Sequence, residues 1–287
     1  MLSRAQSGRV EARTSTPLIR GPLIMGIVNV TPDSFSDGGC FLDPANAIAH
    51  ARALIADGAD LLDVGGESTR PHAEPVPADV EIARVVPVIA AIRAESDIPI
   101  SIDTMKPAVA RAAIAAGASL WNDVTALTWS PDSLAIAAEL DCGVVLMHMR
   151  GEPGTMQDDP RYEDVVQEVA DYLMTRAEAA MGAGVRREAI QLDPGIGFGK
   201  TAAHSLTLLA RLDRIVALGF PVVLGVSRKS FLRQVDRAAK TAEDRLAGSL
   251  AAALAGVRAG AATLRVHDVR ETRQALAVQA AIEQARA

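Results

Sequence analysis

The chain has 287 residues, a formal net charge of −6 and 49% hydrophobic residues, few of them aromatic. The excess of acidic residues argues against nonspecific nucleic-acid binding, which relies on a basic face, so an anionic ligand would have to be bound by a local basic cluster. The two cysteines, Cys40 and Cys142, lack the spacing of a metal site and predict free thiols in a reducing compartment.

No segment is expected to span a membrane, because the Ala-rich run Leu246–Leu264 contains Arg258 and several glycines. We therefore expect a cytoplasmic protein. Residues 1–20 carry arginines together with Ser and Thr, as transit peptides do, but they include Glu11 and no clear amphipathic pattern. The favoured interpretation is a disordered tail over residues 1–20, followed by a single domain over residues 21–287.

Short β-branched runs alternate with longer segments of helical period through the rest of the chain. The predicted strands are Leu23–Val30, Leu61–Val64, Ile98–Ile102, Leu120–Val124, Gly143–His148, Ile190–Leu192, Pro221–Gly225 and Thr263–Val266. The predicted helices are Ala45–Ala56, Asp79–Ala94, Ala108–Ala115, Asp132–Leu140, Tyr162–Ala183, Ser205–Ala217, a turn from Ser230, Thr241–Ala259 and Thr272–Ala285.

Eight strands that alternate with helices predict an α/β protein with the TIM (β/α)8 barrel fold. The structural alternative is an open, doubly wound sheet. Such a sheet usually carries a glycine-rich phosphate loop directly after its first strand, whereas Gly38 and Gly39 come late in a loop. The barrel is therefore favoured.

The first loop passes from an apolar strand into polar and acidic residues, in the segment Gly26-Ile-Val-Asn-Val-Thr-Pro-Asp-Ser-Phe-Ser-Asp-Gly-Gly39. A plain surface turn would also be rich in Asn, Pro, Asp and Gly. It would not need Asn29 at the end of the strand, Phe35 in the loop and Asp37 beyond it. A functional loop is the favoured interpretation.

Polar residues also end later strands, and in a barrel these ends meet at one mouth, where catalytic groups collect. Asp103, Asn122 and Asp193 lie at or beside the last residue of a strand and are predicted to face into the mouth, whereas Asp123 is assigned to a cap. Inward carboxylates need a partner, and the predicted partner is Lys229. Such a group suits the edge of a flat heterocycle such as a pterin or a purine.

A second set of polar residues is basic. Arg265 and His267 are two residues apart on a strand and so share a face, where they could bind a phosphate together with Asn29. The segment Ser227–Ser230, at the start of a helix, would add backbone N–H groups and a positive dipole end for a second anion. A solvated basic turn is the alternative for this segment, and it is less favoured beside Arg265 and His267.

Other residues have less specific predictions. Met147 ends the fifth strand, and its flexible side chain would suit the wall of a pterin slot, while the role of His148 stays open. Helix-surface, helix-start or packing roles are predicted for His50, His204, Trp121 and Trp129.

Six motifs occur in order along the chain: the first-loop segment Gly26–Gly39, Gly65-Gly-Glu-Ser-Thr-Arg-Pro71, Ser101-Ile-Asp-Thr104, Leu192-Asp-Pro-Gly-Ile-Gly-Phe198, Gly225-Val-Ser-Arg-Lys-Ser-Phe231 and Arg265-Val-His-Asp268. In this order they resemble the motifs of the dihydropteroate synthases. The resemblance covers nearly everything after the N-terminal tail.

The resemblance implies condensation of 6-hydroxymethyl-7,8-dihydropterin pyrophosphate with p-aminobenzoate, giving 7,8-dihydropteroate and pyrophosphate, in a Mg²⁺-dependent step of folate synthesis that sulfonamides inhibit. It also implies a homodimer that binds small molecules. The implied pterin-binding residues are Asp103, Asn122, Asp193 and Lys229, with Met147 beside them. The implied pyrophosphate-binding residues are Asn29, Arg265 and His267, of which Asn29 would also be a metal ligand.

By the same resemblance, the p-aminobenzoate pocket would be formed by Phe35, Thr69, Arg70, Pro71, Phe198 and Ser230. The residues expected to carry catalysis are Asp37, Asp103, Asp193 and Lys229. Three positions depart from the family pattern: His72 stands where Gly commonly follows Arg-Pro, Arg233 where Gly is usual, and Thr125-Ala-Leu replaces a Ser-Gly turn. These departures affect loop shape, and therefore p-aminobenzoate affinity and sulfonamide response.

Two alternatives to this function remain. A methyltetrahydrofolate-dependent corrinoid methyltransferase would share the Asp/Asn pterin-binding residues, but it would not need the p-aminobenzoate loops or the Arg265/His267 pair. A nonenzymatic paralogue would bind pterin without turnover. For the oligomeric state, the apolar helices predicted near Leu246–Leu264 and Thr272–Ala285 could pack against a partner subunit or cover the barrel.

Overall fold

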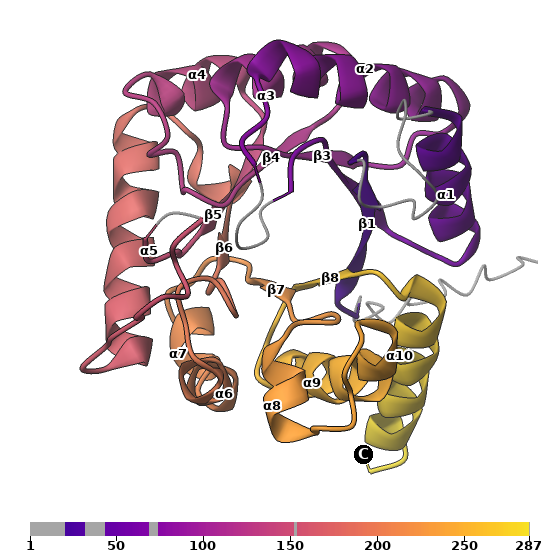
Figure 1. Cartoon of the computed structure of the whole chain (residues 1–287), viewed down its shortest axis with the longest axis vertical. Helices are drawn as coiled ribbons and strands as arrows, with labels where there is room; N and C mark the ends of the chain where they lie inside the picture. The colour runs from indigo at the N-terminus through magenta and orange to yellow at the C-terminus, as the bar shows by residue number, and fades with distance from the viewer. Residues whose placement is uncertain (1–20, 32–43, 69–73, 152–153, 287) are drawn as a thin grey trace, which may run out of the picture.

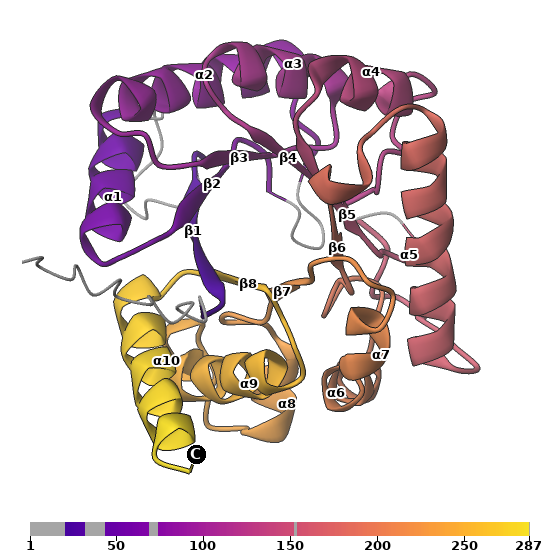
Figure 2. The same cartoon turned by 180° about the vertical axis from the view of Figure 1, so that it is seen from behind.

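The computed structural model describes residues 21–31, 44–68, 74–151 and 154–286. Eight parallel strands form one sheet in the order β6-β5-β4-β3-β2-β1-β8-β7. An isolated parallel bridge between Leu192 and Val222 joins β6 to β7 and so connects the two ends of the sheet. Figures 1 and 2 show the strands around a central axis with the helices outside them. The predicted TIM barrel is confirmed.

The strands are β1 (Leu23–Asn29), β2 (Leu61–Gly65), β3 (Ile100–Asp103), β4 (Leu120–Asp123), β5 (Gly143–Met147), β6 (Ile190–Asp193), β7 (Val223–Gly225) and β8 (Thr263–Val266). The helices are α1 (Pro44–Ala56), α2 (Ala78–Glu95), α3 (Pro107–Ala115), α4 (Ser133–Leu140), α5 (Val165–Gly182), α6 (Ala202–Ala210), α7 (Asp213–Val216), α8 (Phe231–Val235), α9 (Leu246–Arg258) and α10 (Val269–Gln284).

Local capping explains why some helix boundaries differ from the prediction. Asp164 accepts hydrogen bonds from the backbone N–H groups of Val166 and Gln167, so α5 begins after it rather than at Tyr162. Thr201 forms a capping box with His204, so α6 begins three residues earlier than predicted. His204 is thus a helix-start residue, as predicted.

Two further predictions about aromatic and histidine residues have different outcomes. Trp121 is fully buried and donates a hydrogen bond from Nε1 to the carbonyl oxygen of Thr104 (2.8 Å), which confirms a packing role. The packing role predicted for Trp129 is wrong, because this side chain is 52% exposed. His50 lies on α1, where its Nε2 is 3.2 Å from the carbonyl oxygen of Ile27.

The barrel interior changes from apolar to polar along the strands. A cluster of five buried side chains fills its lower part: Met25, Leu61, Leu120, Val145 and Val223. We call this cluster the apolar floor. Alternate residues of a strand face the same side, so Asp63 and Asn122, two residues beyond Leu61 and Leu120, also face inward. The floor therefore lies directly beneath the polar strand ends.

Several sequence predictions concern the ends and the surface of the chain. Residues 1–20 and Cys40 lie outside the described residues, whereas Cys142 is buried and free. Within the described ranges, none of the helices combines the length and the hydrophobicity needed to cross a bilayer.

A buried ion cluster holds the end of β2 against α2 and α3. Lys106 Nζ lies 2.5 Å from Glu67 Oε2 and 2.6 Å from Glu81 Oε2. The side chains of Lys106, Glu67 and Glu81 are 12%, 8% and 0% exposed, respectively. Burial raises the pKa of Glu81, although the bond from Lys106 opposes this shift. Because removing one partner of a buried ion pair leaves a charge without compensation, Lys106 is expected to be important for stability.

We predict that Lys106→Met lowers the free energy of unfolding by about 3–5 kcal/mol, since two buried carboxylates lose their cation. Urea denaturation followed by circular dichroism measures this difference. Arg111→Met is the matched control, because Arg111 is paired with Glu139 at the surface, and it should leave the free energy of unfolding nearly unchanged. Equal effects of the two substitutions would contradict the structural role of Lys106.

Candidate active site

The mouth of the barrel contains a network of charged side chains that crosses its interior. Arg265 on β8 donates from Nε to Asp63 Oδ2 and from Nη2 to Asp103 Oδ2, both at 2.6 Å. Asn122 on β4 donates from Nδ2 to Asp63 Oδ2 at 3.2 Å. In the sheet, β1 lies between β2 and β8, and β3 lies between β2 and β4, so these bonds link strands that are not direct neighbours. Side chains from four strands are thus held in one place.

The predicted partner of Asp103 is wrong. Its carboxylate is paired with Arg265, not with Lys229, because the β8 side chain reaches across the barrel to β3. Lys229 Nζ instead donates to the carbonyl oxygen of Ile196 and lies 4.8 Å from the centre of the Phe198 ring. Arg265 was expected to bind an anionic ligand. In the structure, its Nε and Nη2 atoms donate to the carboxylates of Asp63 and Asp103.

Burial shifts the pKa values of three charged side chains at the mouth toward neutral pH. Burial raises the pKa of Asp103 to about 7, with Arg265 opposing the shift and the charge of Asp63 adding to it. Burial also raises the pKa of Asp193, against the effect of nearby Lys229. Burial lowers the pKa of Lys229 to about 8, against the effect of Asp193. Strongly shifted groups that lie together in this way are typical of functional sites.

Asp63 is a site residue that the sequence prediction missed. It is fully buried and binds both Arg265 and Asn122. Since the Asn122 amide turns its Nδ2 toward this carboxylate, its Oδ1 is left as the acceptor for a ligand. The sequence could have indicated this role, because Asp63 lies two residues after Leu61 and therefore on the same, inward face of β2.

Two glycines lie in close contact with these charged groups. A Cβ atom at Gly65 would lie 3.4 Å from Asp103 Cβ, and one at Gly225 would lie 3.7 Å from Lys229 Nζ. The strand ends of β2 and β7 therefore place no side chain between the barrel wall and the charged groups. Asp103 and Lys229 can therefore lie close to the backbone of these two strands.

The loop between β6 and α6 fits closely against the end of β5. Gly195 has φ of +65°, and a Cβ atom there would lie only 1.9 Å from the carbonyl oxygen of His148. Gly199 has φ of +60°, and a Cβ atom there would lie 2.3 Å from the carbonyl oxygen of Arg150. Only glycine fits both the conformation and the space at these two positions. The loop carries Phe198 between them.

His148, whose role the sequence left open, has a structural role in this contact. Lys200 Nζ lies 2.8 Å from His148 Nδ1 and donates to the carbonyl oxygens of His148 (3.2 Å) and Phe198 (3.0 Å). Burial, together with the charge of Lys200, lowers the pKa of His148 to about 3, so the ring is neutral and accepts at Nδ1. Met147, one residue earlier, packs with Met105, Val124, Met149 and Phe198.

Besides Arg265, the predicted anion-binding residues are Asn29 and His267, which lie at or beyond the ends of β1 and β8. Asn29 ends β1, opposite Gly65 on β2. His267 follows β8, and its Nδ1 lies 3.0 Å from Ser227 Oγ. Ser230 is exposed at the start of α8. Because α8 has only five residues, its dipole is weaker than the predicted helix start suggested.

Five predicted site residues cannot be placed. Phe35, Asp37, Thr69, Arg70 and Pro71 lie outside the described residues. Among the described residues, no three His, Cys, Asp or Glu side chains form a group that could hold a metal ion.

Comparison with known proteins identifies the family. A family model described as "Pterin binding enzyme" matches residues 25–267. The dihydropteroate synthase of Escherichia coli (strain K12) is 45% identical over 257 residues, which is 90% of this chain and 90% of that protein. The chain belongs to the dihydropteroate synthase family.

Solved structures of this family agree. The dihydropteroate synthase of Xanthomonas albilineans with 4-aminobenzoic acid has a TM-score of 0.86 and 49% identity, over 92% of this chain and 93% of that one. The same enzyme in complex with 7,8-dihydropteroate has a TM-score of 0.83 and 46% identity, over 92% and 94% of the two chains.

We predict that Asp63→Asn lowers the pKa of Asp103, because it removes a neighbouring negative charge. At pH 6, Asp103 would then be more fully ionised than in the wild-type protein. A titration of ¹³C-labelled aspartate carboxyls by NMR measures the shift. Glu139→Gln, at the surface, is the control, and an unchanged or higher Asp103 pKa in Asp63→Asn would contradict the network.

Proposed function

We propose that the chain condenses 6-hydroxymethyl-7,8-dihydropterin pyrophosphate with p-aminobenzoate, releasing 7,8-dihydropteroate and pyrophosphate. The observation that carries this proposal is the buried network of Asp63, Arg265, Asp103 and Asn122 at the mouth of the barrel. Membership of the dihydropteroate synthase family favours condensation over methyl transfer.

The pterin would be bound by acceptors and a donor in the barrel. Asp103 and Asp193 supply carboxylate oxygens for ring N–H groups, and Asn122 supplies its Oδ1. Lys229 would donate to a ring acceptor from a position beside Phe198. Met147 would cover one side of the ring. These assignments agree with the inward direction of the side chains at the strand ends.

Chemistry would begin with cleavage of the C–O bond between the pterin methylene and the diphosphate. The bonding electrons leave with the diphosphate, and the positive charge is shared by the methylene carbon and the electron-rich ring. Asp103 and Asp193 stabilise this charge because they are fixed in place before the reaction. The amine of p-aminobenzoate then attacks the carbon and loses a proton to solvent. The rate of this second step depends on correct placement of the amine beside the carbon.

The diphosphate would be bound by Asn29 and His267, with Arg265 adding positive charge while it holds Asp63 and Asp103. Asn29 offers one amide oxygen as a ligand for Mg²⁺. This fits the ion, because Mg²⁺ commonly takes one or two protein oxygens together with substrate phosphates and water. Bound there, Mg²⁺ would neutralise charge on the leaving group. Asp37 stays a predicted catalytic residue.

The p-aminobenzoate pocket would lie between Phe198 and Ser230, beside Lys229. The resemblance adds the loop residues Phe35, Thr69, Arg70 and Pro71. Because the β6–α6 loop is fixed against β5, the Phe198 ring would offer a rigid wall to the aromatic ring of the substrate. Sulfonamides would compete for this pocket.

We also propose a cytoplasmic homodimer. The support is the exposed apolar side chains of Val278 (55%) and Ile282 (50%) on α10, one of the two helices expected to pack against a partner. Light scattering coupled to size-exclusion chromatography distinguishes a monomer from a dimer.

The decisive experiment combines purified protein, the pterin pyrophosphate, Mg²⁺ and p-aminobenzoate. We expect pyrophosphate release that depends on p-aminobenzoate and that a sulfonamide slows. A protein that binds the pterin but releases no pyrophosphate would instead be the nonenzymatic paralogue.

We predict that Asp193→Asn reduces kcat on the order of a hundredfold, because a neutral amide cannot stabilise the positive charge on the pterin. The affinity for inorganic pyrophosphate should change little. Steady-state kinetics and calorimetric titration measure the two quantities. Similar losses in both would argue against a charge-stabilising role.

A further inference from the structure

Arg228 adopts a backbone conformation that is unfavourable for its residue type. Its φ is +58°, in the left-handed region, where glycine is preferred. A non-glycine residue in this region is strained and persists only where surrounding contacts impose it. The residue lies between Ser227 and Lys229, in the turn between β7 and α8. Its side chain must therefore contribute something that glycine could not.

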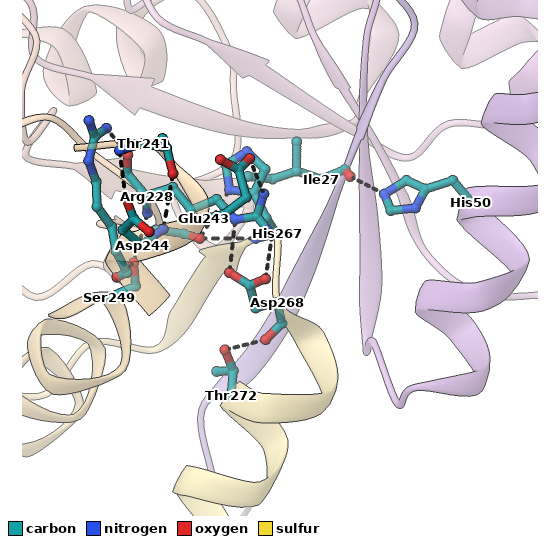
Figure 3. Close-up of polar contacts among 12 residues, drawn as sticks. Ile27, His50, Arg228, Thr241, Glu243, Asp244, Ser249, His267, Asp268 and Thr272 are labelled. Carbon is teal, nitrogen blue, oxygen red and sulfur yellow. Dashed lines mark hydrogen bonds and ion pairs between the residues drawn. The ribbon is translucent and has the colours of Figure 1, made fainter. Parts of the chain in front are cut away.

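The guanidinium of Arg228 faces carboxylates. Its Nε donates to Asp268 Oδ2 at 3.1 Å and its Nη2 to Asp268 Oδ1 at 2.5 Å, which makes a bidentate pair. Its Nη1 lies 3.7 Å from Glu243 Oε1. Figure 3 shows the Arg228 side chain next to Asp268 at the start of α10. Its positive charge is thus used locally, although the basic Ser-Arg-Lys-Ser sequence suggested an anion ligand.

The backbone of Arg228 is also fixed, on the side of α9. Its N–H donates to Ser249 Oγ at 2.8 Å, and its carbonyl oxygen accepts from Arg245 Nη1 at 2.9 Å. These two bonds explain how the left-handed conformation is held. They also make the turn a rigid support for the side chain.

The pair connects two turns that both carry site residues. Asp268 directly follows His267, and Ser227 directly precedes Arg228. Ser227 Oγ accepts from the backbone N–H of His267 at 3.2 Å and lies 3.0 Å from its Nδ1. Two adjacent residues of the β7–α8 turn therefore hold two adjacent residues of the β8–α10 turn. This continues the pairing of β7 with β8 beyond the ends of the strands.

We propose that Arg228 is a positioning residue that acts through Asp268. Its bidentate pair fixes His267 relative to the turn that carries Lys229 and Ser230, and so sets the geometry of the diphosphate side of the site. The inference rests on the proposed function in assigning the diphosphate to His267. It predicts that loss of the pair weakens anion binding while the pterin groups on β3, β4 and β6 keep their arrangement.

The test uses Arg228→Gly, which suits the left-handed backbone and removes only the side chain, and Asp268→Asn, which keeps the shape and removes the charge. We expect each to weaken binding of inorganic pyrophosphate in MgCl₂ by about tenfold, measured by calorimetry. Binding of 6-hydroxymethylpterin, which has no phosphate, should stay within about twofold of wild type. The double variant should lose no more than either single variant, because the two residues form one interaction.

Glu243→Gln is the matched control, because it removes the other carboxylate near Arg228 and should leave both affinities unchanged. Arg228→Lys, which keeps the charge but not the bidentate geometry, should fall between wild type and Arg228→Gly. Should Arg228→Gly fail to fold, as judged by thermal unfolding, Asp268→Asn alone gives the answer.

Three results would overturn the inference: unchanged pyrophosphate binding in Asp268→Asn, equal losses for both ligands, or additive losses in the double variant. A wild-type protein that binds no pyrophosphate would overturn it as well. The binding experiment needs no turnover. A wild-type protein that binds pyrophosphate but does not condense the two substrates would therefore count against the proposed function only.

Discussion

The salt bridges from Arg265 to Asp63 and Asp103 are the constraint on which the site depends. Three charged side chains in a barrel interior would be costly if any were unpaired, because burial removes them from water. The guanidinium resolves this by binding one carboxylate at Nε and the other at Nη2. Asp63 in turn orients the Asn122 amide. The positions of Asp63, Asp103 and Asn122 thus follow from one cation on β8.

A second level of support lies in the turns that follow the strands. The β6–α6 loop is held by glycines and by Lys200 against the end of β5, while the β7–α8 turn is held by Ser227 and Arg228 against the residues after β8. Each contact links loops that follow neighbouring strands. A substitution in one of these loops is therefore expected to affect the strand end or loop that it contacts.

The sequence predicted the barrel and the positions of Asp103, Asn122 and Asp193, because strand periodicity shows which residues end a strand and which face they occupy. It did not predict the partner of Asp103. That choice depends on which long side chain crosses the interior, and Arg265 is 162 residues away along the chain. Arg228 was grouped with the anion-binding turn because the segment Ser227–Ser230 was expected to offer backbone N–H groups and a helix start, whereas its pairing with Asp268 is not visible in the sequence.

The apolar floor has a consequence for how two substrates can use one site. Met25, Leu61, Leu120, Val145 and Val223 seal the barrel beneath Asp63 and Asn122, so molecules enter and leave through the mouth only. A ring bound to the deepest acceptors has to arrive before anything that sits above it near Phe198 and Ser230. Under the proposed site assignments, this arrangement favours a compulsory sequence of arrival, with the bicyclic substrate first and the arylamine second, and with the joined product departing past the same rim.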